Sequence, residues 1–286
     1  PEMLLKEEHI TIFQANWEDK PSNIEAIAKA MNLGLESLVF LDDNPAERAQ
    51  VRAALPEVAV PELPMDPAFY PRVLLSAGYF DAVSFSDEDR SRVAQYQANA
   101  KRVEVQSKAR NLGDYLDSLD MVLTVRPFDQ ASRARVTQLI NKSNQFNLTT
   151  KRYTENQVAE IELNEKVYTS HARLHDAFGD NGIISVVICR EEDEVWEIDT
   201  WLMSCRVLGR RVEEAFLNTV AAAAKRAGAR YLRGRYIPSP RNELVANHFQ
   251  KLDFELLDRQ ADGSSLWQLA LASRELTVVP IRVDEG

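Results

Sequence analysis

Two adjacent carboxylates near the start of the chain follow a short apolar segment. Asp42 and Asp43 come directly after residues 37–41, and Glu47 lies about one helical turn further on. If 37–41 is a buried strand of a parallel sheet, these side chains lie at the carboxyl edge of that sheet, where α/β proteins bind ligands. Carboxylate oxygens suit a partly hydrated Mg²⁺, and Lys20 could neutralise a phosphate in the same crevice. The alternative is that the aspartates cap the following helix and that Lys20 is solvated.

A basic turn lies between a predicted strand at 195–203 and a predicted long helix at 208–226. It contains Arg206, Gly209 and Arg210. The N–H groups at the start of a helix lack backbone partners and carry partial positive charge, so they attract phosphate. A glycine would let the anion approach the backbone closely, and the arginines add side-chain charge. The turn is therefore predicted to bind a phosphate-bearing ligand.

Other residues in this part of the chain could take part in chemistry. Cys205 lies beside arginines and a helix start, which lower a thiol pKa, so it could be a nucleophile; the alternative is a small core residue. Cys189, inside an apolar strand, is predicted to be core. On the strand at 195–203, Glu197 or Asp199 could serve as a general base, and the alternative is a solvated or ion-paired carboxylate.

The overall composition is that of a globular protein, with 45% hydrophobic and 27% charged residues in a chain of 286. The net charge of −10, from 34 basic and 44 acidic residues, argues against a general nucleic-acid-binding protein. No apolar run reaches the roughly 20 residues that span a bilayer, and no secretion signal opens the chain. Two cysteines make no disulfide framework. We therefore expect a cytoplasmic protein that binds neither membrane nor nucleic acid.

The hydrophobic pattern predicts an α/β chain in three parts. Residues 1–75 follow the order helix, strand, acidic loop, helix and strand, with the strands at 37–41 and 58–61, as in a doubly wound sheet. A proline-rich stretch then marks a boundary, and a helical connector is expected at 76–120. Residues 121–286 alternate strands and helices, which is typical of a mixed α/β domain. The strands are predicted at 121–125, 167–174, 183–189, 195–203, 231–237, 254–257 and 266–271, and the helices at 132–141, 155–163, 208–226 and 242–252.

The segments 16–24 and 40–48 resemble the FkbH-like branch of the haloacid dehalogenase (HAD) superfamily. The resemblance implies that residues 1–75 are the C-terminal portion of a HAD-like sheet. The nucleophile of that superfamily lies in a DxDxT-type motif, whose counterpart would precede Pro1. We therefore expect a fragment that needs the missing motif for phosphatase activity.

The same resemblance assigns functions to the residues of the acidic loop. It implies that Lys20 contacts a phosphate group of the substrate. It also implies that Asp43, supported by Asp42 and Glu47, binds Mg²⁺. Lys20, Asp42 and Asp43 would then assist phosphoryl transfer, and Cys205 is the candidate nucleophile of the second half.

The turn at 206–211 resembles the phosphate loop of GNAT acyltransferases, whose pattern is Gln/Arg-x-x-Gly-x-Gly/Ala. Here Arg211 stands where the family has a small residue. The order of predicted elements over 121–271 follows the GNAT topology, so a GNAT-like domain is expected. The strings 204–210 and 236–242 are also similar to the C-terminal region of FkbH-like proteins. They imply a phosphate- or pantetheine-binding cleft formed by Arg206, Gly209, Arg210, Tyr236, Arg241 and Asn242.

The resemblance to FkbH-like proteins implies a function in polyketide biosynthesis. Such proteins load a glycerate-derived unit from 1,3-bisphosphoglycerate onto the thiol of an acyl carrier protein, in methoxymalonyl-type or tetronate routes. The expected partners are the carrier protein and a small phosphorylated substrate. The expected cofactors are Mg²⁺ and the carrier's phosphopantetheine, or CoA. An acidic carrier would suit a basic patch of Arg206, Arg210, Arg233, Arg235 and Arg241. Two alternatives stay open: an acyl-CoA-dependent GNAT acyltransferase and a non-catalytic carrier-docking module.

Overall fold

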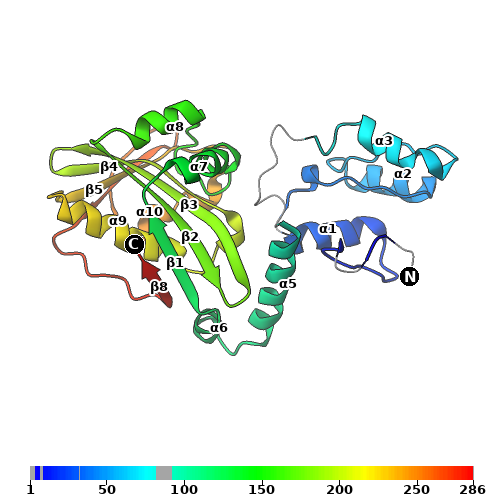
Figure 1. Ribbon diagram of the computed structural model, residues 1–286, viewed down its shortest axis with the longest axis horizontal. Helices are drawn as coiled ribbons and strands as arrows, with labels where there is room; N and C mark the ends of the chain where they lie inside the picture. The colour runs from blue at the N-terminus through cyan, green and yellow to red at the C-terminus, as the bar shows by residue number, and fades with distance from the viewer. Residues whose placement is uncertain (1–3, 7–8, 32, 82–91, 286) are drawn as a thin grey trace. The chain divides into compact units, whose positions relative to one another are not determined.

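The computed structural model describes residues 4–6, 9–31, 33–81 and 92–285. The chain divides into two compact units, unit 1 at residues 1–104 and unit 2 at residues 105–286. Figure 1 shows the helices and strands of each unit. Among the helices of the described ranges, none is both long and apolar enough to cross a membrane.

Unit 1 has a small core between two helices and an extended segment. Ile24 of the first helix packs with Val51 of the next long helix and with Leu55 and Val58 beyond its end. The second long helix begins at Pro45, a residue favoured in the first turn, and the side chain of Asn44 caps its N-terminus. The described helices of the unit are α1 (Lys20–Met31), η2 (Leu35–Ser37), α2 (Pro45–Ala54), η3 (Pro67–Phe69) and α3 (Tyr70–Ser76), and α5 (Arg92–Lys108) crosses into unit 2.

The two strands predicted for unit 1, at 37–41 and 58–61, are wrong as full strands. In the described part of the unit they form one parallel bridge, between Val39 and Ala59. Two backbone hydrogen bonds, of 2.8 and 3.1 Å, accompany this bridge. The start of the first predicted strand is taken by η2. The physical reason is that a strand needs neighbours on its edges, because two short parallel segments form too few hydrogen bonds to extend a ladder.

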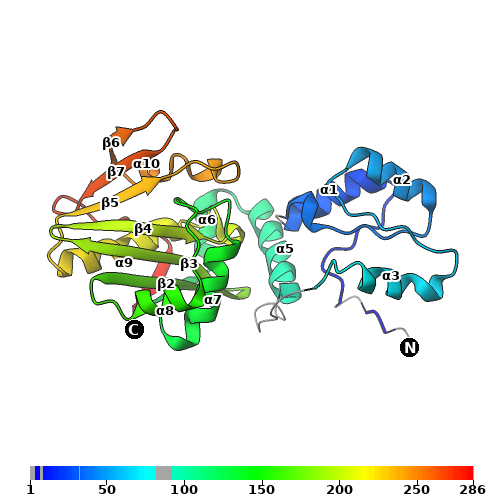
Figure 2. The same ribbon diagram turned by 90° about the horizontal axis from the view of Figure 1, so that it is seen from above.

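Unit 2 is built on one eight-stranded mixed sheet in the order β6-β7-β5-β4-β3-β2-β1-β8, most of which can be followed in Figure 2. The pairs β4–β5 and β1–β8 are parallel and the other pairs are antiparallel. This confirms the predicted mixed α/β class. The strands are β1 (Met121–Arg126), β2 (Val167–Asp176), β3 (Gly179–Glu192), β4 (Val195–Met203), β5 (Tyr231–Tyr236), β6 (Glu255–Arg259), β7 (Ser265–Ala270) and β8 (Ile281–Asp284).

The helices of unit 2 cover the two faces of its sheet unequally. On one face α7 and α8 pack against Val186 and Ile188 of β3 and against Leu202 of β4. On the other face α9 and α10 pack through Phe216 and Phe249. The α7–α8 cluster includes no residue of β5, β6 or β7. The helices are α6 (Leu112–Ser118), α7 (Gln130–Lys142), α8 (Glu155–Glu162), η4 (Cys205–Val207), α9 (Val212–Arg226), η5 (Glu243–Val245) and α10 (His248–Lys251).

The parallel strands β4 and β5 pair over only part of their length. Their register ends at Ile198 and Gly234, although β4 continues to Met203. Beyond Ile198, the edge of β4 that faces β5 would lack hydrogen-bond partners unless another segment supplied them. Buried backbone N–H and C=O groups are almost always paired, so the gap must be filled.

The segment 146–148 fills the gap between β4 and β5. Leu148 N–H donates to the Trp201 carbonyl at 3.1 Å, and Met203 N–H donates to the Phe146 carbonyl at 3.0 Å. On the other side, the backbone N–H just after β5 donates to the Leu148 carbonyl at 2.9 Å. The three residues of the segment are fully buried or nearly so. The protein therefore closes its own split sheet with an extra short strand-like segment.

Two predicted helices differ from the structure. The helix predicted at 208–226 begins only at Val212, because Gly209 and Arg211 have φ values of 75° and 62°, which a right-handed helix excludes. The helix predicted at 242–252 is divided into η5 and the short α10. The edge strand β8 was not predicted, because four residues are too few to show a period.

Gly234 of β5 lies against α10. A Cβ atom added there would lie 2.1 Å from the ring of Phe249, so the ring or the strand would have to move. We expect Gly234→Ala to lower the free energy of unfolding by about 1–3 kcal/mol, measured by urea denaturation. Phe249→Leu in the same background should recover part of this loss. A Gly234→Ala protein as stable as the wild type would contradict this packing of α10 on β5.

Candidate functional site

A buried arginine holds the acidic loop of unit 1. Arg48 of α2 is 6% exposed, and its Nη1 donates to the carbonyl oxygens of Asp42 and Asp43 at 2.8 and 3.0 Å. Asn44 caps α2, since its side chain accepts the N–H of the second helical residue at 2.9 Å. The backbone of the loop is therefore fixed from inside. The Asp43 side chain is exposed, and Asp42 is half-buried.

The acidic loop fits Mg²⁺ in the type of its ligands but supplies few of them. Asp42 already accepts the N–H of Asn44 at 2.9 Å, and Glu47 is half-buried in the first turn of α2. Over the described ranges of the chain, no three His, Cys, Asp or Glu side chains are grouped as a metal site. Mg²⁺ usually keeps several waters and takes one or two carboxylates. Asp42 and Asp43 could hold the ion together with waters and a substrate phosphate. Lys20, half-buried at the start of α1, is the predicted contact of that phosphate.

The basic turn before α9 is bonded to the rest of unit 2. Arg210 is 4% exposed, and its Nη1 lies 3.0 Å from Oδ2 of the buried Asp176. Arg206 Nη2 donates to the carbonyl oxygen of Asn181 at 2.7 Å. Charge-assisted bonds of this kind are strong, and breaking a buried pair leaves an uncompensated charge. Both arginines therefore fix the turn to the β2–β3 hairpin.

Gly209 and Arg211 shape the start of α9. A Cβ atom at Gly209 would meet no atom within 4 Å, so the glycine is needed for its positive φ and not for a close approach. Arg211 is the N-cap residue, and its guanidinium lies 2.6 Å from Glu214. Glu213 and Glu214 place negative charge at the helix N-terminus, where a bound anion would otherwise be favoured. A pyrophosphate would have to compete with these contacts.

The two cysteines lie in different environments. Cys189 of β3 is fully buried, and burial raises the pKa of its thiol well above the usual range. Its prediction as a core residue is confirmed. Cys205 is half-buried and begins the 3₁₀ turn η4, next to Arg206.

Asn242 joins three segments of unit 2. It is fully buried, and its Nδ2 donates to the carbonyl oxygens of Asn147 and Ile237, both at 2.9 Å. Its Oδ1 accepts the N–H of Ser239 at 2.7 Å and lies 3.4 Å from the Tyr236 hydroxyl. These bonds use the hydrogen-bonding groups of the amide inside the protein. Asn242 therefore positions the loop after β5 and holds it to segment 146–148.

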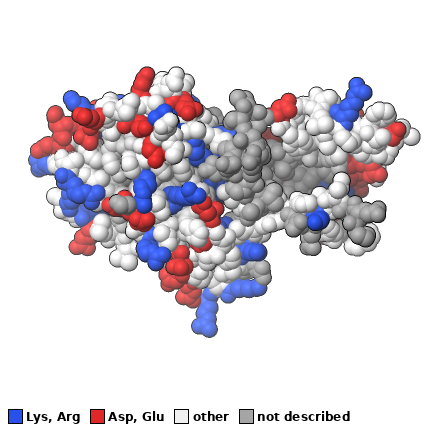
Figure 3. Space-filling model, in the orientation of Figure 1, with Lys and Arg blue, Asp and Glu red and all other residues white. Residues whose placement is uncertain are grey.

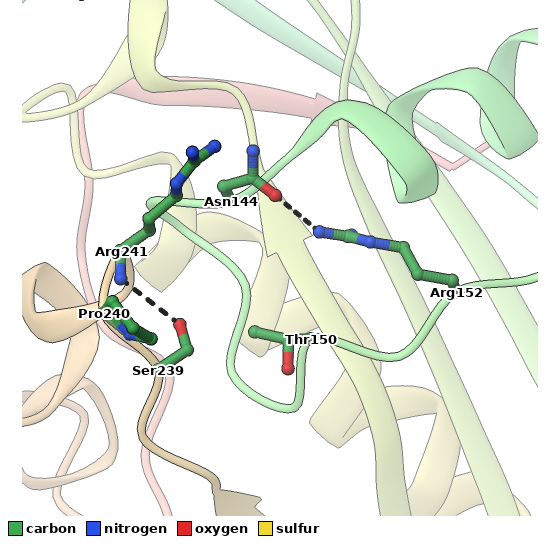
Figure 4. A pocket seen from close by; sticks show the side chains of 6 residues that line it. All are labelled: Asn144, Thr150, Arg152, Ser239, Pro240 and Arg241. Carbon is green, nitrogen blue, oxygen red and sulfur yellow. Dashed lines mark hydrogen bonds between the residues drawn. The ribbon is translucent and has the colours of Figure 1, made fainter.

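A pocket of about 290 Å³ lies between the loop after α7 and the loop after β5 (Figure 4). Arg152 and Arg241 approach it from opposite sides, with Asn144 between them. Arg152 donates to Asn144 Oδ1 at 2.6 Å, and burial lowers its pKa, although a guanidinium stays charged. The pocket is lined by Asn144, Thr150, Arg152, Ser239, Pro240 and Arg241.

The backbone conformation of Thr150 sets the path of the loop after α7, which lines the pocket. Its φ of 53° is in the left-handed region, which a β-branched residue rarely adopts. The Asn147 side chain holds this conformation by accepting the Thr150 N–H at 2.9 Å. Thr150 and Arg152 consequently line the pocket, whereas Lys151 bonds to a carboxylate of β4. Backbone strain of this kind is concentrated at binding sites.

The carboxylate bonded to Lys151 is that of Asp199, which lies at a β-bulge where β4 has one residue more than β3. Its Oδ1 lies 2.6 Å from Lys151 Nζ and 3.0 Å from Arg190 Nε, and Tyr153 donates to Oδ2. Burial would raise the pKa of Asp199, but the bonds from Lys151, Tyr153 and Arg190 outweigh it and hold the pKa at about 2. The prediction of an ion-paired carboxylate is confirmed, and Asp199 is a poor base near neutral pH.

Sequence reasoning identified only one pocket residue, Arg241, and missed its counterparts on the α7–α8 loop. The available signal was a polar loop between two well-capped helices, in which Thr150 and Arg152 are adjacent to Lys151. Of the residues predicted to form one cleft, Arg206 and Arg210 bond to the β2–β3 hairpin, and Asn242 supports the pocket loop.

Comparisons with known proteins give partial matches. No protein-family model matches the chain, and no curated protein matches it. A solved structure of the N-terminal part of BF1531 from Bacteroides fragilis, which contains a phosphatase domain complexed with Mg, is 50% identical over 30% of this chain, with a TM-score of 0.29. The match spans 23% of that structure, which is less than a quarter of its length.

Two acetyltransferase structures match about half of the chain. Ribosomal-protein-S18-alanine N-acetyltransferase from Escherichia coli is 10% identical, with 55% of this chain and 99% of that chain covered and a TM-score of 0.41. Spermidine N-acetyltransferase from Vibrio cholerae, in complex with CoA and spermine, is 9% identical, with 52% and 96% covered and a TM-score of 0.40.

The stability of unit 2 should depend on the ionisation of Asp199. Its folded-state pKa of about 2 is below the value of 3.8 for the free side chain, so its contribution is present above pH 4 and lost as the pH falls through 2. The shift corresponds to about 2 kcal/mol. We expect Asp199→Asn to be less stable than the wild type at pH 7, with the difference shrinking toward pH 2 in urea denaturation. A difference that is independent of pH would contradict this assignment.

Proposed function

We propose that the chain takes part in loading a phosphate-activated, glycerate-derived acyl unit onto the thiol of an acyl carrier protein. In this proposal, unit 2 receives the phosphate-bearing end of the substrate or of the carrier's phosphopantetheine arm. The observation that supports it is the pocket between the loops after α7 and β5. Arg241 lies there with the hydroxyls of Thr150 and Ser239 and the amide of Asn144. Arg152 adds a second positive charge, although its guanidinium also bonds to the carbonyl oxygens of Ile140 and Ser143. Such a donor set suits an oxyanion.

The size of the pocket indicates which part of a ligand it could hold. About 290 Å³ is at the lower end of the range for ligand sites. A phosphate with a short chain fits this volume, whereas a whole CoA molecule does not. The pocket is therefore proposed to hold a phosphate group and a few attached atoms.

The proposed reaction has two steps. In the first, the carrier sulfur attacks the acyl carbonyl carbon, the C–S bond forms, and the bond from that carbon to the phosphate oxygen breaks. Phosphate leaves, and the thiol proton passes to solvent or a base. In the second step the remaining phosphate ester is hydrolysed: water oxygen bonds to phosphorus, the P–O bond to the glyceryl oxygen breaks, and inorganic phosphate and the glyceryl hydroxyl are released. For that step, Mg²⁺ held by Asp42 and Asp43 would supply charge neutralisation, and Lys20 would contact the phosphate.

The acyl-CoA-dependent alternative has less support from the geometry. An extended ligand with amide groups can bind a strand edge through backbone hydrogen bonds. The edge of β4 beyond Ile198 is already paired with segment 146–148. Arg206 and Arg210 of the turn before α9 are also already bonded, to Asn181 and Asp176, so a CoA pyrophosphate would have to compete with these contacts.

A non-catalytic docking module is the second candidate. The six residues that line the pocket include no histidine, cysteine, aspartate or glutamate. Asp199 of β4, which bonds to Lys151 of the pocket loop, is held ionised by two cations. A module of this kind would bind the carrier arm while the chemistry takes place elsewhere.

The transfer itself is tested by intact-protein mass spectrometry of a holo carrier protein incubated with 1,3-bisphosphoglycerate and Mg²⁺. The chain is compared with a version extended upstream by a segment that supplies a DxDxT-type motif. We expect a glyceryl mass gain on the carrier only with the extended version, because removal of the remaining phosphate needs that motif. No gain with either version would reject glyceryl transfer.

The pocket is tested by binding of inorganic phosphate, 4′-phosphopantetheine and CoA, measured by calorimetry. We expect Arg241→Ala to weaken phosphate and phosphopantetheine binding about tenfold, because a charge-assisted bond contributes roughly 1.5 kcal/mol or more. Arg259→Ala, on β6 and outside the pocket lining, is the matched control and should bind as the wild type does. Equal binding by wild type and Arg241→Ala would place the phosphate site elsewhere.

A further inference from the structure

A strip of basic side chains in unit 2 comes from the loop after α7 and from the strands β3 and β5. We define this basic strip by Lys151, Arg190 of β3, and Arg233 and Arg235 of β5. On β5, Arg233 and Arg235 are half-buried and alternate with Leu232 and Tyr236, which are buried on the opposite, α9-side face. Arg233 and Arg235 therefore lie on the face that α7 and α8 leave open beyond β4 (Figure 2). Lys151 and Arg190 are both bonded to Asp199 of β4.

The basic strip carries more positive than negative charge. Lys151 and Arg190 share the single carboxylate of Asp199, which neutralises only one of them. Arg233 donates to the neutral side chain of Gln268 on β7 at 3.0 Å. Within the part of the chain that the structure describes, neither Arg233 nor Arg235 forms an ion pair with an acidic side chain. The charge of the strip is therefore available to a partner.

Two acids of β4 lie among the cations of the strip. Asp199 is bonded to Lys151 and Arg190, and Glu197 is the cross-strand neighbour of both Arg190 and Arg233. Figure 3 shows acidic and basic side chains interspersed over the face of unit 2 that it presents. The four cations of the strip outnumber these two carboxylates, although the chain as a whole has a net charge of −10.

The basic strip and the pocket are connected by one loop. Lys151 of the strip stands between Thr150 and Arg152 of the pocket lining. β5, which carries Arg233 and Arg235, leads directly into the loop that carries Arg241. A partner on the strip would therefore be placed beside the pocket.

We propose that the basic strip is the docking surface for the carrier protein, which binds through an acidic helical face while its phosphopantetheine arm enters the pocket. This inference rests on the proposed function for the identity of the partner. Charge complementarity over the strip would steer encounter and orient the arm, since opposite charges raise association rates. A protein is favoured over a nucleic acid because a compact acidic face needs only the few cations of the strip, whereas a long polyanion would also meet the rest of a chain whose net charge is −10.

The test uses the whole chain with an acidic acyl carrier protein in its apo form, which lacks the arm, and in its holo form. We expect both forms to bind, with the holo form tighter and both weakened by salt. The double variant Arg233→Glu/Arg235→Glu should weaken binding of both forms about tenfold or more. Arg241→Ala should weaken only the holo form. Lys225→Glu, on α9 behind the sheet, is the matched charge-reversal control and should change affinity less than twofold.

A second measurement does not depend on variants. In NMR spectra of the labelled chain, the apo carrier should shift amide signals of β4, β5 and residues 149–153 and leave those of α9 unchanged. Absence of carrier binding, shifts confined to other elements, or full affinity in the double variant would overturn the proposal. Equal binding of a 20-nucleotide DNA strand, with the same loss in the double variant, would overturn it in favour of a nucleic-acid surface.

The result can be separated from the test of the proposed function. If glyceryl loading occurs and the double variant loads the carrier at the wild-type rate, the docking surface is wrong and the transfer stands. If the carrier docks on the strip and no glyceryl unit is transferred, the surface stands and the transfer is rejected.

Discussion

The insertion of segment 146–148 between β4 and β5 is the constraint on which the arrangement of unit 2 depends. Where the two parallel strands part, each unpaired buried backbone group would cost about 1–3 kcal/mol. The segment pairs with Trp201 and Met203 on one side, and Asn242 bonds to the Asn147 carbonyl on the other. Because the segment is fixed at both edges, the residues that follow it leave from a defined point. That point decides which side chains reach the pocket and which reach Asp199.

The internal bonds of the arginine side chains also determine which positive charges of unit 2 are exposed. Arg210 and Arg206 face inward, to Asp176 and the Asn181 carbonyl, so they stabilise the turn before α9. More exposed cations include Lys151 and Arg190 beside Asp199, and Arg152 and Arg241 line the pocket. The start of α9, where Glu214 lies beside Arg211, is therefore less suited to an anion than the loops after α7 and β5.

The sequence allowed the elements of unit 2 to be predicted, but not the partners of its polar side chains. Strand and helix periods are local, so β2 to β5 and α7 to α9 were recognised from neighbouring residues. The bond between Arg210 and Asp176 joins positions 34 residues apart, and that between Asn242 and Asn147 spans 95. No local pattern records such pairs. In unit 1 the apolar run at 37–41 predicted a strand, but a strand depends on neighbours that the run itself does not contain.

The role expected for Asp199 changes once its neighbours in the structure are known. On the sequence it is a carboxylate on a strand near a basic turn, which is compatible with a general base. In the structure the β-bulge turns it toward Lys151, Tyr153 and Arg190, and its pKa of about 2 keeps it charged. One carboxylate between two cations neutralises only one of them. Screening limits the field of distant acids to about 8 Å at physiological salt, so the charge around Asp199 depends mainly on these neighbours. Asp199 therefore holds Lys151 and Arg190 in place and is not suited to accept a proton near neutral pH.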